Sequence, residues 1–258
     1  MPERNLKGKV AIIIGATSAI GRAVALTLSR SGAAVVLHDP TDSPEGLVAE
    51  VEHAGGQALA VQADLSKAEE VQRLFQETIA HFGKVDILVN DSRAILETTL
   101  ADTKEGEFER VKAIKECSNA TVYVCEQAAR HLADGGRIIN FCSSLGSVFD
   151  ATFHAEMEYD RAIRQIHHIL SKELGPRRIT LNTVSPGSTD DEVFEKASEK
   201  MLGRFRRSGT EEEKQKEKTA EMERLAQPQA FANVVAHLVA DEAYWLTGQT
   251  IRANWAMS

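Results

Sequence analysis

Short apolar segments alternate with amphipathic segments along most of this chain, and this alternation restricts the fold more than any other feature of the sequence. The apolar segments are Val10–Ile14, Ala34–Leu37, Ala58–Val61, Ile87–Val89, Arg137–Phe141 and Thr180–Val184. Between them, segments such as Glu45–His53 and Ala68–Phe82 place apolar residues at helical spacing among charged ones. Buried strands that alternate with helices predict an α/β fold with a doubly wound parallel sheet.

The length of the chain favours one domain. With 258 residues it can bury a sizeable core, so we expect a single domain over residues 1–258. The one break in composition is the polar stretch 190–224, which contains RFRRSGTEEEKQKEK. We expect residues 188–226 to form a polar helical segment that covers the substrate, although a solvated helical excursion would carry the same charges.

Charge and composition exclude several classes of function. A net charge of −8 disfavours a nucleic-acid surface, which needs clustered Lys and Arg. No apolar run approaches the ~20 residues that cross a bilayer, and the amino terminus MPERNLKGKV lacks an apolar signal core. Cys117, Cys125 and Cys142 show neither metal nor disulfide spacing, which predicts no metal site and a reducing, cytoplasmic location. The expected partner is therefore a small-molecule substrate.

The ends of the first three expected strands carry residues suited to a nucleotide. The first strand leads into IIIGATSAIGRAVALTLSRSG, where a glycine turn lets backbone N–H groups approach a pyrophosphate at the positive end of a helix. Such a turn alone also fits a purely structural connection. The second strand ends in VVLHD, which places Asp39 where a carboxylate accepts hydrogen bonds from an adenosine ribose, and the third ends in VQADLS. Together these strand ends favour dinucleotide binding.

Several motifs, in the same order along the chain, resemble those of the short-chain dehydrogenase/reductase family. They are GATSAIG, ADL, DILVN, GRIINFCSSLG, ITLNTVSPG and the tail RLAQPQAFANVVAHLVADEAYWLTGQ. The resemblance covers nearly the whole chain. It implies a Rossmann-type sheet of seven parallel strands, a nicotinamide dinucleotide, and a homodimer or homotetramer built on the two long central helices.

The resemblance also implies which residues contact the cofactor. Gly15, Ser18, Ile20 and Gly21 would face the phosphates, Asp64 and Leu65 would flank the adenine, and Asn90 would close the fourth strand. Asp39 matches the acid that binds the ribose, and its charge would repel the 2′-phosphate of NADP. Ser18 stands where many NADP-binding relatives carry an arginine. We therefore expect NAD in preference to NADP.

The chain also departs from the family pattern. Ala19 replaces the middle glycine of the turn, and Asn90 is followed by Asp91-Ser92-Arg93 in place of Asn-Ala-Gly. The asparagine of the family's active site falls on either Lys115 or Ser118, depending on which end of the helix sets the register. These changes alter the nicotinamide half of the expected site more than the adenine half.

The largest departure concerns the residues that move protons in the family. Ser143 matches the family's serine, but the Tyr-x-x-x-Lys pair falls on Glu156 and Asp160. Tyr159 lies three residues further on and would reach the site only if the start of the helix were shifted. Nearby carboxylates oppose ionisation of a phenol, so Tyr159 would be a poor base. Glu156 and Asp160 form either a coupled acid/base pair or an exposed, acidic helix start.

Three functions remain open at this point. The first is an oxidoreductase that uses a nicotinamide dinucleotide on a hydroxyl or carbonyl compound, with atypical catalytic residues and weak ordinary reductase activity. The second is a non-redox enzyme of the same fold, such as an isomerase or cyclase in natural-product biosynthesis. The third is a non-catalytic partner that binds a dinucleotide. The sequence alone leaves open whether the chain catalyses a redox reaction.

Overall fold

The computed structural model describes residues 5–40, 43–91, 107–142, 163–186 and 226–253, with residues 107–118 described as helical backbone only. Within these ranges seven strands form one sheet in the order β3-β2-β1-β4-β5-β6-β7, and every neighbouring pair is parallel. The strands are β1 (Val10–Ile14), β2 (Ala34–His38), β3 (Ala58–Val61), β4 (Val85–Asn90), β5 (Leu132–Phe141), β6 (Thr180–Pro186) and β7 (Thr250–Ala253). The prediction of a doubly wound, seven-stranded parallel sheet is confirmed.

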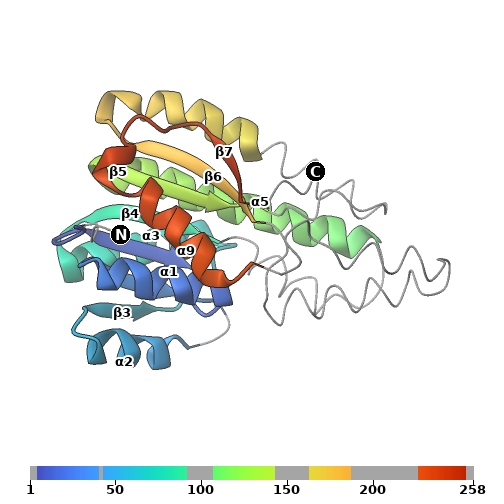
Figure 1. Cartoon of the computed structure of the whole chain (residues 1–258). Helices are drawn as coiled ribbons and strands as arrows, with labels where there is room; N and C mark the ends of the chain where they lie inside the picture. The colour runs from blue at the N-terminus through green and yellow to red at the C-terminus, as the bar shows by residue number, and fades with distance from the viewer. Residues whose placement is uncertain (1–4, 41–42, 92–106, 143–162, 187–225, 254–258) are drawn as a thin grey trace, which may run out of the picture.

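Helices cover both faces of this sheet (Figure 1). The described helices are α1 (Ala19–Arg30), α2 (Glu45–His53), α3 (Ala68–Phe82), α5 (Glu107–His131) and α9 (Pro228–Leu238), with a further helical stretch at 163–173. The short 3-10 helices are η1 (Gly175–Arg177) and η2 (Asp241–Ala243). Apolar side chains of α1, α2 and α9 pack in one buried cluster, and those of α3 and α5 pack in a second one on the opposite face. No described helix combines the length and apolar character needed to cross a membrane.

The central strands are apolar throughout because both of their faces are covered. All five residues of β1 are buried, and the four from Ala11 to Ile14 alternate between the two clusters: Ala11 and Ile13 pack with α1 and α9, whereas Ile12 and Ile14 pack with α3 and α5. A continuous apolar run is therefore the pattern that a central parallel strand requires.

Two strands, β5 and β7, are not fully described by a short run of apolar residues. β5 begins at Leu132, five residues before the expected Arg137, because its first part pairs across an irregularity with Val85 and includes Gly135 at a φ of +77°. Edge strand β7 alternates between exposed and half-buried residues, and only the resemblance to a seven-stranded family pointed to it.

The order of the described strands reverses direction between β1 and β4. β1 lies between β2 and β4, and the chain continues outward from β1 to β3 on one side and from β4 to β7 on the other. Parallel α/β sheets bind ligands beyond the carboxyl ends of the strands at such a reversal. The residues that follow β1, β2 and β4 therefore lie where such a sheet binds its ligand.

Candidate functional site

The turn that follows β1 is tight, and a backbone hydrogen bond joins it to the end of β2. Gly15 has a φ of +72°, a left-handed conformation that favours glycine. The Ala16 N–H donates to the carbonyl oxygen of His38 at 2.9 Å, and the Ser18 N–H donates to that of Gly15 at 3.1 Å. The backbone alone therefore holds this turn against its neighbouring strand.

Ser18 begins α1 as its N-cap. Its Oγ accepts a hydrogen bond from the Gly21 N–H at 2.9 Å, which satisfies one of the N–H groups that every helix start leaves without an intrahelical partner. The first turn of α1 contains no acidic side chain. The positive end of the helix dipole therefore points, without a local negative charge from the helix itself, at the carboxyl edge of the sheet.

Gly21 lets α1 approach the turn closely. A Cβ at this position would lie 2.0 Å from the carbonyl oxygen of Gly15, a distance that no side chain tolerates. Ile20 beside it is buried in the core, and Ala19, which replaces the expected glycine, is exposed at the first position of the helix. The methyl group of Ala19 therefore occupies surface at the helix start and does not distort the turn.

Asp39 follows β2 directly and is buried, with 4% of its surface exposed. Its Oδ2 accepts a hydrogen bond from the hydroxyl of Thr17, a residue of the glycine turn. Beneath it, the Nε2 of His38 lies 2.9 Å from the carbonyl oxygen of Ala63, so this nitrogen carries a proton and donates. Burial lowers the pKa of His38, which keeps the ring neutral at neutral pH. The charge at the end of β2 is thus that of Asp39.

Asp64 and Leu65 follow β3 and have different surroundings. Leu65 is buried beside Val61 and Ile14 in the cluster on the α3 side. The exposed Asp64 accepts hydrogen bonds from the Ser66 hydroxyl at 2.7 Å and from the Ser66 N–H at 3.1 Å, and it pairs with the Lys67 ammonium at 2.9 Å. The Ser66 hydroxyl, followed by Lys67, lowers the pKa of Asp64. Asp64 therefore shapes its own loop, whereas Leu65 supplies apolar surface.

The end of β4 joins the same edge. Asn90 is buried and donates from Nδ2 to Oδ1 of Asn140, on β5, at 3.0 Å. The next residue, Asp91, is also buried; its N–H donates to the carbonyl oxygen of Ile14 at 3.2 Å. The Ser18 hydroxyl makes a long hydrogen bond of 3.4 Å to Oδ2 of Asp91. Two buried carboxylates, Asp39 and Asp91, therefore flank the glycine turn.

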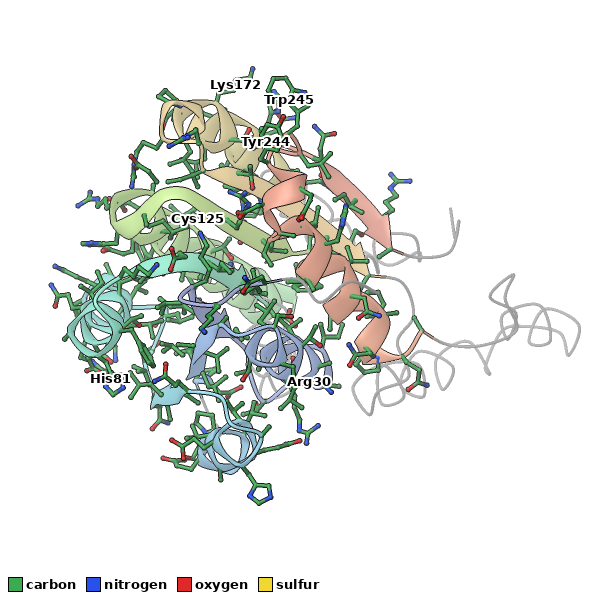
Figure 2. The ribbon with its side chains drawn as sticks, turned by 60° about the vertical axis from the view of Figure 1, so that its left-hand side comes forward. Arg30, His81, Cys125, Lys172, Tyr244 and Trp245 are labelled. Atoms are coloured by element: carbon green, nitrogen blue, oxygen red, sulfur yellow. The ribbon has the colours of Figure 1, made fainter. Side chains whose placement is uncertain are left out.

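A buried polar chain continues from Asn140 into the interior below this edge. The sulfur of Cys125 lies 3.9 Å from Oδ1 of Asn140 and 3.9 Å from Nε2 of His167, whose Nδ1 lies 2.9 Å from the Thr183 hydroxyl. Burial raises the pKa of Cys125 to about 12 and lowers that of His167 to about 4. Cys125, labelled in the interior in Figure 2, is therefore an inert thiol, and this chain of contacts is structural.

The structure brings most of the expected cofactor residues together. Gly15, Ser18, Ile20, Gly21, Asp39 and Asn90 surround the carboxyl ends of β1, β2 and β4, and Asp64 and Leu65 follow β3 at the same edge. The expected catalytic residues Ser143, Glu156, Tyr159 and Asp160 lie outside the described residues, as does the expected cover segment apart from Ala226. Sequence reasoning missed the contacts of Thr17 and Asp91. Their only signal was a hydroxyl or carboxylate next to a strand end.

The sequence and the fold match known proteins over almost their full length. A family model described as Enoyl-(Acyl carrier protein) reductase matches residues 15–255. The short chain dehydrogenase/reductase nsrJ of Aspergillus novofumigatus (strain IBT 16806) is 35% identical over 250 residues, which are 95% of this chain and 94% of that protein.

Two solved structures share the fold. A short chain dehydrogenase from Burkholderia cenocepacia J2315 in complex with NADP has a TM-score of 0.79 and 28% identity, covering 97% of this chain and 98% of that one. The landomycin C-6 ketoreductase LanV with bound NADP and rabelomycin has a TM-score of 0.78 and 30% identity, covering 98% and 97%. Motifs, strand order and full-length relatives agree: the chain belongs to the short-chain dehydrogenase/reductase family of oxidoreductases.

Proposed function

We propose that this protein is an oxidoreductase that binds NAD in preference to NADP and acts on a hydroxyl or carbonyl group of a small molecule. One observation carries the proposal: the start of α1, whose first turn has no acidic side chain, lies next to the buried carboxylate of Asp39. The helix dipole makes this start positively polarised. A pyrophosphate and a ribose require these two features side by side.

The described residues fit a nicotinamide dinucleotide. The absence of a side chain at Gly21 keeps α1 close to the turn, and the start of the helix at Ser18–Ile20 would bind the pyrophosphate. Asp39 would accept hydrogen bonds from the ribose of adenosine, and Leu65 would flank the adenine. When bound, the nicotinamide supplies or accepts a hydride.

The preference for NAD follows from charge. A 2′-phosphate on the ribose would bring negative charge to the buried Asp39, and Ser18 offers it no cation. Both solved neighbours described above are NADP complexes, so this fold accommodates that dinucleotide as well. The carboxylate after β2 is the feature that favours NAD in this chain.

We infer that proton transfer differs from the usual family mechanism. Ser143 would position the substrate oxygen, and Glu156 and Asp160 would stand at the places of the family's tyrosine and lysine. A carboxylate at the lysine position cannot lower the pKa of a phenol, so ordinary carbonyl reduction should be slow. The name of LanV, a ketoreductase, supports a ketone as the substrate class to test first.

A titration followed by a turnover assay tests the proposal. Calorimetry with NAD and NADP on the full chain should give a tighter dissociation constant for NAD. Incubation with NAD or NADH and a panel of small alcohols and ketones should then change nicotinamide absorbance. Binding with substrate turnover but no absorbance change would instead favour an isomerase or cyclase, and binding alone would favour a non-catalytic partner. Absence of any dinucleotide binding would contradict the proposal.

A further inference from the structure

The two hydroxyls of the glycine turn contact carboxylates on both sides of β1. Thr17 donates to Asp39, which follows β2, and Ser18 donates to Asp91, which follows β4. Because β1 lies between β2 and β4, these contacts extend across three adjacent strand ends. The Ser18 contact is long, at 3.4 Å, and Ser18 already caps α1. The Thr17 contact is the closer of the two.

The turn does not need the Thr17 hydroxyl to keep its path. Backbone hydrogen bonds from Ala16 to His38 and from Ser18 to Gly15 already fix it, and Gly21 packs against it. Thr17 is half-buried, and its hydroxyl donates to the buried carboxylate of Asp39. The contact therefore serves the carboxylate more than the turn.

A carboxylate needs such a partner if it is to recognise a diol. The last side-chain torsion of aspartate is broad and nearly two-fold, so the backbone conformation alone does not set the direction of its two oxygens. A hydrogen bond from a hydroxyl to an ionised carboxylate is stronger than one between neutral groups, and it fixes the plane of the acceptor. Held in this way, Asp39 presents its oxygens in one orientation, as bidentate recognition of two neighbouring hydroxyls requires.

We propose that Thr17 is a positioning residue that determines cofactor specificity: it orients Asp39 toward the two free hydroxyls of an adenosine ribose. Discrimination between NAD and NADP is then a property of the Thr17–Asp39 pair and not of Asp39 alone. This inference rests on the proposed dinucleotide binding. Thr17 acts through Asp39 and does not itself need to contact the ribose.

Calorimetric titration of NAD and NADP into the full chain tests the pair. Thr17→Val keeps the shape of the side chain and removes the hydroxyl, so it should weaken NAD binding about tenfold and leave NADP binding within about twofold. Thr17→Ser keeps the hydroxyl and should match the unmodified chain. In an Asp39→Ala background, Thr17→Val should have no further effect. Thr27→Val is the matched control: Thr27 is also half-buried, but it lies further along α1, away from the turn. This change should alter neither the dissociation constant of NAD nor that of NADP.

The outcomes separate the inference from the proposed function. If the unmodified chain prefers NAD and Thr17→Val keeps that preference, the inference is wrong and the proposed function stands. A folded Thr17→Val variant that binds NAD and NADP equally less tightly would show that Thr17 supports the turn, and this would overturn the inference. A further, additive loss of affinity in the Asp39→Ala background would overturn it as well. If the unmodified chain binds neither dinucleotide or prefers NADP, both are wrong. Thr17→Ala serves as a second variant if Thr17→Val does not fold.

Discussion

Gly21 lies where α1 contacts the turn that follows β1, and its hydrogen is the only substituent that fits there. We predict that Gly21→Ala destabilises the protein by about 3 kcal/mol, because the new methyl group would meet backbone at 2.0 Å and must displace the helix. Urea unfolding measures this loss. Gly46→Ala is the matched control: Gly46 is exposed in α2 with open space around its Cβ position, so the change should stabilise by less than about 1 kcal/mol. Similar losses in both variants would show that the close approach is not what Gly21 provides.

In the proposed register, Glu156 and Asp160 stand at the places of the family's tyrosine and lysine. Because general acid–base groups contribute about 10²–10⁴-fold to a rate, the paired change Glu156→Tyr with Asp160→Lys should raise carbonyl reductase activity about 10²-fold or more. Tyr159→Phe should leave the activity of the unmodified chain unchanged. Steady-state assays with NADH and a ketone measure both. The unmodified chain could instead reduce the ketone rapidly, at about 10 per second. If Tyr159→Phe then abolished this activity, Tyr159 would be the catalytic acid.

Buried strands were predictable from the sequence, whereas irregular strands were not. β1 and β2 follow from apolar runs because both sheet faces are covered there, and edge strand β3 follows from a short apolar run although three of its four residues are only half-buried. The early start of β5 depends on pairing with Val85, and β7 depends on pairing with β6; no local pattern records either partner. The same limit applies to the site. Gly15 and Asp39 stand at strand ends and were predicted, whereas the contacts of Thr17 and Asp91 join residues that are distant in sequence and meet only in the folded sheet.

Asn182 connects β6 to the segment that leads into β7. It is fully buried; its Nδ2 donates to the carbonyl oxygen of Leu246 at 2.8 Å, and its Oδ1 accepts from the Gln249 N–H at 3.2 Å. Tyr244 and Trp245, just before this segment, lie at the surface, as Figure 2 shows, and contribute little burial. The amide of Asn182 therefore holds this segment together with hydrogen bonds of the β6 backbone, such as that from the Gly248 N–H to the carbonyl oxygen of Leu181 at 2.7 Å.

We predict that Asn182→Ala costs about 2 kcal/mol, because it leaves two backbone groups without their partner. Hydrogen exchange should accelerate at residues 246–253 more than in β1. Asn233→Ala, at an exposed position of α9, is the control and should change neither the stability nor the exchange of that segment. Uniform acceleration over the whole sheet would argue against a local role for Asn182.

The buried histidines His38 and His167 make the free energy of unfolding of the protein depend on pH. Burial lowers the pKa of His167 from 6.5 to about 4, and it lowers that of His38. The unfolded chain therefore binds more protons than the folded one between these pKa values, so stability falls as pH drops through the unfolded value of 6.5. His167 alone should remove about 2 kcal/mol between roughly pH 7 and pH 5.

Chemical denaturation at both pH values tests this dependence. His167→Asn should lose less stability on acidification than the unmodified chain, whatever its starting stability. His53→Asn, which replaces an exposed histidine at the end of α2, should lose as much stability as the unmodified chain when the pH is lowered. An unchanged pH dependence in His167→Asn would mean that His167 is not kept neutral in the folded state.

We propose that a nicotinamide dinucleotide binds across the carboxyl ends of β2, β1 and β4. A crystal structure of the full chain grown with NAD would show where the dinucleotide lies. We predict the adenosine ribose against Asp39 and the pyrophosphate over the start of α1 at Ser18–Ile20. Density for NAD at the amino edge of the sheet, or on an outer helix face, with the turn at Gly15–Gly21 empty, would contradict it.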